Sequence, residues 1–99
     1  MAAYIISDVA FHDEASARNY RERAAPSITQ HGGTYLARAG AIEVLEGSWS
    51  PRAIIIVEFP DMEAARAWYR SAEYAEALIF RDAALSRDLI LVEGVGQPL

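Results

Sequence analysis

Arginine, carboxylate and imidazole side chains near the ends of predicted elements are the groups in this sequence that could do chemistry. Arg38 follows an apolar run, Glu58 lies near the end of another, and His31 precedes a double glycine. A desolvated glutamate suits a general base, because burial raises its pKa. A guanidinium group binds carboxylates, and an imidazole exchanges protons near neutral pH. As catalytic candidates, these three residues indicate proton transfer on a small organic acid or an aromatic compound.

Each catalytic candidate also has a structural interpretation. Arg38 either pairs with a carboxylate such as Glu46 or Glu58, or binds an anionic ligand. Glu58 is either a general base or a carboxylate that accepts hydrogen bonds from the start of a helix. His31 is either an acid or base in a pocket, or a cation at a helix C-terminus. The sequence leaves both interpretations open for each residue.

Four further residues are the expected ligand-binding groups: Tyr20, Tyr69, Tyr74 and Arg81. The tyrosines occupy helical positions that face the predicted sheet, where a ring belongs either to the core or to the wall of a pocket. A buried hydroxyl needs a hydrogen-bond partner in both cases. Arg81 is expected to join Arg38 in holding a carboxylate or an enolate.

Composition excludes several classes of chemistry. The 99 residues contain no cysteine, which excludes disulfides, thiolate nucleophiles and cysteine-bound metals. All nine basic residues are arginine, which removes lysine Schiff bases and pyridoxal phosphate chemistry with them. The two histidines, His12 and His31, lack carboxylates at the spacing of a metal site. We therefore expect neither a metal nor a cofactor.

Charge and hydropathy bear on partners and location. A formal net charge of −5 argues against nucleic acid and anionic membranes as partners. The first residues lack the basic region of a signal peptide. No apolar run approaches the roughly 20 residues needed to cross a bilayer. These features predict a cytoplasmic protein. The small organic ligand is expected from the candidate side chains described above, and not from charge or hydropathy.

The length predicts one domain over residues 1–95 and a C-terminal tail over residues 96–99. Asp61 and Ser71 are expected to cap helices, because their side chains can accept from backbone amides of the first turn. Pro26 is expected to kink or restart the first helix, and a bulge or bend is expected near Gly40. The predicted elements are, in order, a strand over 4–9, a helix from 13, an extended region over 34–45, a turn over 46–51, a strand over 53–59, helices after 61 and 71, and a strand over 88–93.

This order is βαββαβ, the α+β arrangement of ferredoxin-like folds, with the helices on one face of an antiparallel sheet. The strand over 53–59 carries Ile54 and Ile56 on one face and Ile55, Val57 and Phe59 on the other. An antiparallel sheet whose second face met water would be polar there. We therefore expect a homodimer in which another subunit's sheet covers that face.

Several stretches of the chain match one known pattern in combination: residues 32–33, 36–40, 43–49, 57–60, 68–74 and Arg81. On these residues the chain resembles the domain-of-unknown-function family 1330 over residues 4–94. One departure is Ala72, where the family usually has a proline. Proline suits the first position of a helix, so its loss implies slightly lower rigidity at that helix start.

The resemblance implies the fold of the dimeric α/β-barrel superfamily, which pairs two ferredoxin-like subunits sheet to sheet. That superfamily includes cofactor-free monooxygenases, haem-degrading enzymes, isomerases and proteins without known activity, so kinship does not select a function. We expect a small-molecule-binding protein or enzyme, with proton transfer or cofactor-free chemistry on a small organic acid or aromatic. The alternative is a non-catalytic dimeric module for structure or interaction. A pocket of roughly 300 Å³ or more with convergent polar groups favours the first hypothesis, and a filled interior favours the second.

Overall fold

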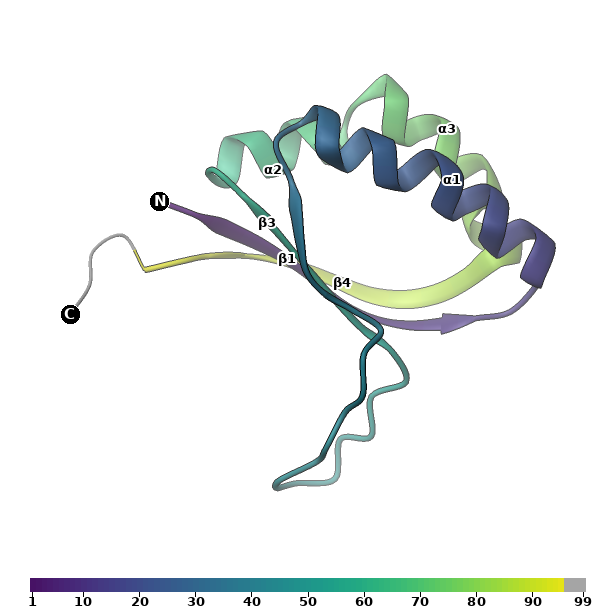
Figure 1. Ribbon diagram of the computed structural model, residues 1–99, viewed down its shortest axis with the longest axis vertical. Helices are drawn as coiled ribbons and strands as arrows, with labels where there is room; N and C mark the ends of the chain where they lie inside the picture. The colour runs from purple at the N-terminus through teal and green to yellow at the C-terminus, as the bar shows by residue number, and fades with distance from the viewer. Residues whose placement is uncertain (96–99) are drawn as a thin grey trace.

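A four-stranded antiparallel sheet covered on one face by three helices makes up the part of the chain that the structure describes, residues 1–95 (Figure 1). The structure is a computed structural model. The predicted tail over residues 96–99 lies outside the described residues. In chain order the elements are β1 (Ala3–Phe11), α1 (Glu14–Gln30), β2 (Thr34–Arg38), β3 (Ile54–Phe59), α2 (Met62–Tyr69), α3 (Ala72–Ala84) and β4 (Leu85–Glu93).

The strand order across the sheet is β2-β3-β1-β4. β1 runs antiparallel to both of its neighbours, and β2 runs antiparallel to β3. This is the split βαβ arrangement, and it confirms the predicted ferredoxin-like α+β fold. β2 and β4 are the outer strands, so a residue on each of them lies at an opposite edge of the sheet.

Side-chain caps fix where the helices begin. Asp13 accepts a hydrogen bond from the Ser16 amide at 2.8 Å, and Asp61 accepts one from the Ala64 amide at 2.7 Å. Ser71 accepts from the Tyr74 amide at 3.1 Å, so α3 starts directly after α2 and places Tyr74 in its first turn. The predicted caps at Asp61 and Ser71 are confirmed. α1 continues through Pro26 to Gln30 without a break.

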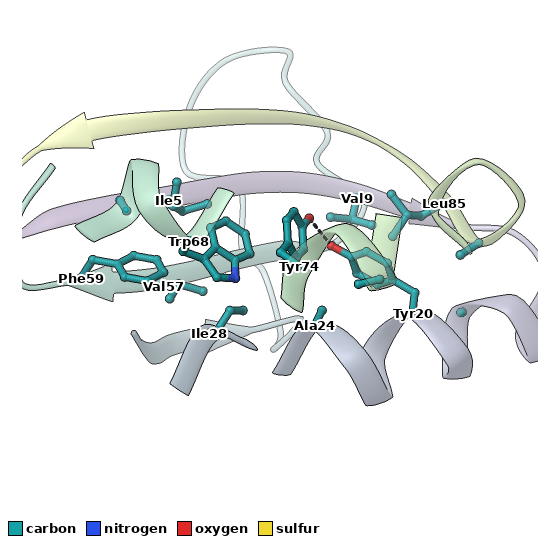
Figure 2. Close-up of a cluster of buried hydrophobic side chains, with 14 residues drawn as sticks. Ile5, Val9, Tyr20, Ala24, Ile28, Val57, Phe59, Trp68, Tyr74 and Leu85 are labelled. Atoms are coloured by element: carbon teal, nitrogen blue, oxygen red, sulfur yellow. Dashed lines mark hydrogen bonds between the residues drawn. The ribbon is translucent and has the colours of Figure 1, made fainter. Parts of the chain in front are cut away.

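Side chains alternate between the two faces of each strand, and those that point toward the helices form the hydrophobic core. Ile5, Val9, Val57 and Phe59 point toward the helices and are at most 6% exposed. Aromatic rings continue this layer: Phe59 lies 5.6 Å from Trp68, and Trp68 lies 4.1 Å from Tyr74, measured between ring centroids. Figure 2 shows these rings in a row between the sheet and α1. The row ends at the tyrosines of the candidate site.

The second strand differs from its prediction. β2 ends at Arg38 rather than at residue 45, and its irregularity falls between Tyr35 and Ala37 rather than near Gly40. A bulge adds one residue to a strand and so inverts the faces of the residues after it. Arg38 therefore pairs with Ile55 and lies on the helix-covered face with Tyr35, not on the face of Leu36, where regular alternation along the strand would place it. Residues 39–53 then project away from the sheet and the helices (Figure 1).

The last strand begins earlier than predicted. β4 starts at Leu85 rather than at residue 88, because α3 passes into it without a linker and Leu85 already has extended backbone angles. β4 pairs with β1 over nine residues, from Leu85 opposite Phe11 to Glu93 opposite Ala3. The earlier start brings Arg87 into the strand, with its side chain on the helix-covered face.

The other face of the sheet carries large apolar side chains. Ile90 is 58% exposed and Val92 is 43% exposed, and they share this face with Ile6, Ile54 and Ile56 by strand register. The predicted apolar character of both faces is confirmed. No helix in residues 1–95 combines the length and the apolar character needed to cross a membrane.

Candidate ligand-binding site

A cavity of about 260 Å³ lies between the sheet and the helices. Its volume is slightly below the roughly 300 Å³ of the smallest typical small-molecule sites, and its wall is mostly apolar, as such sites usually are. The floor comes from all four strands and the roof from α1 and α2. The apolar residues that line it are Ile5, Val9, Phe11, Ala24, Ile28, Ala39, Ile55, Val57, Trp68, Leu85 and Leu89.

A hydrogen bond holds the Trp68 wall in place. The indole Nε1 donates to Ser27 Oγ at 3.0 Å, and Ser27 Oγ donates to the Ala24 carbonyl at 2.6 Å. Trp68 is 2% exposed and Ser27 is 1% exposed. A buried N–H group without a partner would be costly, so this chain of bonds fixes the indole against α1.

Two tyrosines and one arginine form a polar cluster at the cavity. The hydroxyl oxygens of Tyr20 and Tyr74 lie 2.5 Å apart (Figure 2). Arg87 donates from Nη1 to the Tyr20 oxygen at 2.8 Å and from Nη2 to the Tyr74 oxygen at 2.5 Å. The three residues come from α1, α3 and β4, so the cluster joins both long helices to an edge strand.

One of the two hydroxyl protons of this cluster has no acceptor within it. Tyr20 and Tyr74 have one hydroxyl proton each, and their mutual hydrogen bond uses one of them. Arg87 provides only donors, so among residues 1–95 the second hydroxyl proton has no acceptor in the cluster. Tyr74 is fully buried, whereas Tyr20 lines the cavity. The arrangement that uses every group has Tyr74 donate to Tyr20 and Tyr20 donate into the cavity.

The pKa shifts in the cluster favour the protonated forms of Tyr74 and Arg87, so both residues remain hydrogen-bond donors. Burial, followed by the neighbouring Tyr20, raises the pKa of Tyr74 far above its usual range, although Arg87 acts against this. Burial alone would lower the pKa of Arg87, but the Tyr20 and Tyr74 oxygens raise it above its usual value. At neutral pH, Tyr74 is therefore protonated and Arg87 carries its positive charge.

A second guanidinium group faces the same cavity. Arg38 lines it from β2, with its guanidinium carbon 4.3 Å from the centre of the Tyr35 ring. No carboxylate of residues 1–95 forms an ion pair with Arg38 or with Arg87. Aromatic rings and hydroxyls thus hold both cations, which leaves their charge available to a ligand.

The other predicted catalytic residues lie elsewhere. Glu58 faces away from the helices, directly opposite Tyr4, and hydrogen bonding to it raises the Tyr4 pKa. His31 caps the C-terminus of α1, and its Nε2 is 3.4 Å from a Glu73 carboxylate oxygen. The structure does not bring Glu58 or His31 to the cavity with Arg38. Within residues 1–95, no three metal-ligating side chains converge on one point.

The predicted ligand-binding residues divide into two groups. Tyr20 lines the cavity, and the buried Tyr74 forms a hydrogen bond with Tyr20 beside it. Tyr69 and Arg81 line a more open hollow beside it, together with Arg87. Tyr69 is 42% exposed, and Arg81 is 3.5 Å from a carboxylate oxygen of Asp82. The binding roles of Tyr69 and Arg81 stay predictions.

Sequence reasoning missed Arg87, which donates a hydrogen bond to each of the two tyrosine hydroxyls of the cluster. Its signal was present in the alternation of β4, where Leu85, Arg87, Leu89 and Leu91 share one face. An arginine at an otherwise apolar parity points to an internal partner or a ligand. The signal was lost because the predicted strand began one residue after Arg87.

Comparisons with known proteins support the fold and name a family. Two structures of RPA0582, a protein of unknown function from Rhodopseudomonas palustris (one of them methylated), align with a TM-score of 0.76 and 18% identity. They cover 97% of this chain and 84% of that protein. SnoaB, a cofactor-independent oxygenase from Streptomyces nogalater, aligns with a TM-score of 0.66 and 11% identity over 97% of this chain and 95% of SnoaB. At such identities the likeness concerns the fold alone.

No curated protein sequence matches the chain significantly. The family described as "Domain of unknown function (DUF1330)" matches residues 2–95. This match spans nearly the whole chain and includes every strand and helix of the sheet and its cover. The chain therefore belongs to the DUF1330 family.

Proposed function

We propose that this protein binds a small organic acid, as its anion, in the cavity between the sheet and the helices. One observation carries the proposal. Arg38 and Arg87 bring two guanidinium groups to a mainly apolar cavity, and neither is paired with a carboxylate of residues 1–95. A partly buried cation such as Arg87 is unfavourable without a counter-ion. An organic anion supplies the missing charge and fills the apolar space.

The polar cluster supports an orientation for this anion. We place its acidic group at Arg87 and Tyr20, because the guanidinium has N–H donors beyond its two tyrosine bonds and one hydroxyl proton of the cluster lacks an acceptor within it. Charge-assisted hydrogen bonds of this kind are about twice as strong as neutral ones. The hydrocarbon part of the ligand, aromatic or aliphatic, packs against Trp68 and the apolar floor of the sheet.

The same donors bear on chemistry. Positive charge and hydroxyl donors aimed at one oxygen stabilise an enolate or a phenolate as well as a carboxylate. Among residues 1–95, no carboxylate or imidazole lines the cavity, so Glu58 and His31 have no place in the proposed site as bases. We propose stabilisation of an anion that enters already ionised, rather than proton abstraction by the protein. A polar cluster with a donor left for a ligand supports this function over a purely structural module.

We also propose that the protein acts as a homodimer. The apolar face that holds Ile56 and Ile90 lies on the side of the sheet away from the cavity. A second copy of the chain, packed sheet to sheet, removes this face from water. The cavity and the dimer contact then use opposite faces of one sheet, so dimer formation does not cover the cavity.

Isothermal titration calorimetry with benzoate tests the binding proposal, with benzamide as the neutral ligand of the same shape. We expect benzoate to bind and benzamide to bind at least about tenfold more weakly, because a charge-assisted bond is lost. Arg87→Met is expected to weaken benzoate binding about tenfold or more. The control is Arg18→Gln, which changes an exposed arginine of α1 outside the cavity.

The Arg87→Lys variant shows whether a loss of binding in Arg87→Met comes from a folding defect. Lysine keeps the positive charge but lacks the planar guanidinium that donates to both tyrosines. We expect this variant to bind benzoate with intermediate affinity and to unfold at nearly the same temperature as the wild type. Equal binding of benzoate and benzamide, or wild-type affinity in Arg87→Met, would contradict the proposed function.

A further inference from the structure

The two arginines of the cavity stand at opposite edges of the sheet, and we infer from this that its ligand is a dianion with two separated acidic groups. One group lies at Arg87 and the other at Arg38. The inference rests on the proposed function and deepens it, because it names the class of acid. A dicarboxylate with an apolar chain between its ends is the simplest member of that class.

Strand register places the arginines far apart. Arg38 of β2 pairs with Ile55, Ile55 pairs with Ser7, and Ser7 pairs with Leu89 of β4. Neighbouring strands are about 4.8 Å apart, so this row spans about 14 Å across the sheet. Arg87 lies on the same face of β4 as Leu89, two residues away along the strand. The two side chains therefore enter the cavity from different sides.

Each guanidinium group is held near its own edge by local partners. Arg38 stacks over Tyr35, a residue of the same strand. Arg87 is fixed by two hydrogen bonds to Tyr20 and Tyr74, which belong to the helices above β4. A single carboxylate that meets Arg87 in this geometry leaves the charge of Arg38 unbalanced at the other edge.

The charges that line the cavity also indicate a ligand with two negative charges. Three arginines line it, and one of them, Arg21, has a carboxylate partner in Glu14 at 3.7 Å. Arg38 and Arg87 have no ion pair within residues 1–95, so two positive charges are uncompensated. A monoanion neutralises one of them. A dianion neutralises both, and its chain lies over the apolar floor between them.

The two ends are unequal in burial. Arg87 is partly buried and bound to the buried tyrosines, whereas Arg38 is exposed at the rim of the cavity. Water screens an exposed charge more strongly than a buried one. We therefore expect the Arg87 end to hold any carboxylate, and the Arg38 end to add affinity only when a second acidic group is present.

Calorimetry on the purified full chain at neutral pH tests this with pairs of acids of equal chain length. Glutarate, adipate and pimelate are compared with pentanoate, hexanoate and heptanoate. In at least one pair, the dicarboxylate is expected to bind about tenfold more tightly, which corresponds to one further charge-assisted contact. The series of lengths ensures that a poor fit of one chain does not decide the result.

Two variants and one control show which arginine binds which acidic group of the ligand. Arg38→Gln is expected to reduce dicarboxylate affinity to that of the paired monocarboxylate and to leave the monocarboxylate unchanged. Arg87→Met is expected to weaken both acids about tenfold or more, and Arg18→Gln neither. Equal affinities within every pair, or a dicarboxylate advantage that survives Arg38→Gln, would overturn the dianion inference alone. Absence of binding by all six acids would also overturn the dianion inference, and absence of benzoate binding in addition would overturn the proposed function itself.

Discussion

The hydroxyl oxygens of Tyr20 and Tyr74 lie 2.5 Å apart, although the two residues are 54 positions apart in the chain. Tyr20 belongs to α1 and Tyr74 to the first turn of α3. Arg87 joins them from β4 with a hydrogen bond to each. The contact between the two helices is therefore also the polar end of the cavity, and a change in one affects the other.

Tyr74→Phe is expected to destabilise the fold by about 1–3 kcal/mol, because it removes a buried hydroxyl that two neighbours use as a partner. Urea unfolding followed by circular dichroism measures this. Tyr69→Phe is the control, since Tyr69 is 42% exposed and its change is expected to stay within about 0.5 kcal/mol. Equal losses in the two variants would contradict the role given to the buried cluster.

Alkaline pH is expected to destabilise the protein through the same residue. Burial raises the folded-state pKa of Tyr74 above its usual value of 10.0, so above pH 10 the unfolded chain loses this proton first. The stability that the hydroxyl provides is then complete below pH 10 and falls as the pH rises past it. Urea midpoints at increasing alkaline pH should fall more steeply for the wild type than for Tyr74→Phe. Parallel curves would contradict the expectation.

The sequence predicts those parts of the fold that depend on neighbours along the chain. The two faces of β3 follow from the alternation of Ile54 to Phe59, and the helix starts follow from Asp61 and Ser71, whose side chains bond amides three residues on. Both patterns are local, so they can be read without tertiary contacts.

The site depends on features that are not local. The face of Arg38 is set by a bulge at the position of Leu36, and no glycine or proline marks that position in the sequence. Arg87 entered the site only because α3 passes into β4 without a linker. The meeting of Tyr20, Tyr74 and Arg87 requires the packing of three elements distant in the chain, which spacing alone does not encode.

Acid is expected to weaken the attachment of the 39–53 segment to the sheet. Asp8 of β1 accepts from the Arg52 amide at 3.0 Å and from the Trp49 indole at 3.1 Å. These contacts, the Arg52 amide first, lower the Asp8 pKa below its usual value of 3.8, although desolvation acts against them. A depressed folded-state pKa contributes stability above about pH 3.8 that is lost as the pH falls through the folded value.

Asp8→Asn should therefore reduce the loss of stability between neutral pH and about pH 3, measured by urea unfolding at each pH. Trp49 fluorescence reports the same segment and should respond less to acid in this variant. Asp82→Asn is the control, because Asp82 lies on α3, far along the chain from this contact. The same acid response in Asp8→Asn and the wild type would refute this account of the segment.

A charge on the open face of the sheet should separate the proposed dimer. Ile56→Glu places a carboxylate at the centre of that face, where burial against a second copy leaves it unpaired. We expect the dissociation constant to rise about 100-fold or more, measured by sedimentation equilibrium. Ile79→Glu, at a position of α3 that is 77% exposed, should leave the association unchanged. A monomeric wild type at high concentration would contradict the dimer.

The binding of an organic anion at Arg87 is most directly tested by NMR of the arginine side chains. The chain has nine arginines and no lysine, so each Nε–H signal can be assigned with single arginine variants. Addition of benzoate is expected to shift the signal of Arg87 most, while the signal of the exposed Arg18 stays in place. Benzoate-induced shifts that omit Arg87, or that appear equally at all nine arginines, would contradict the proposed site.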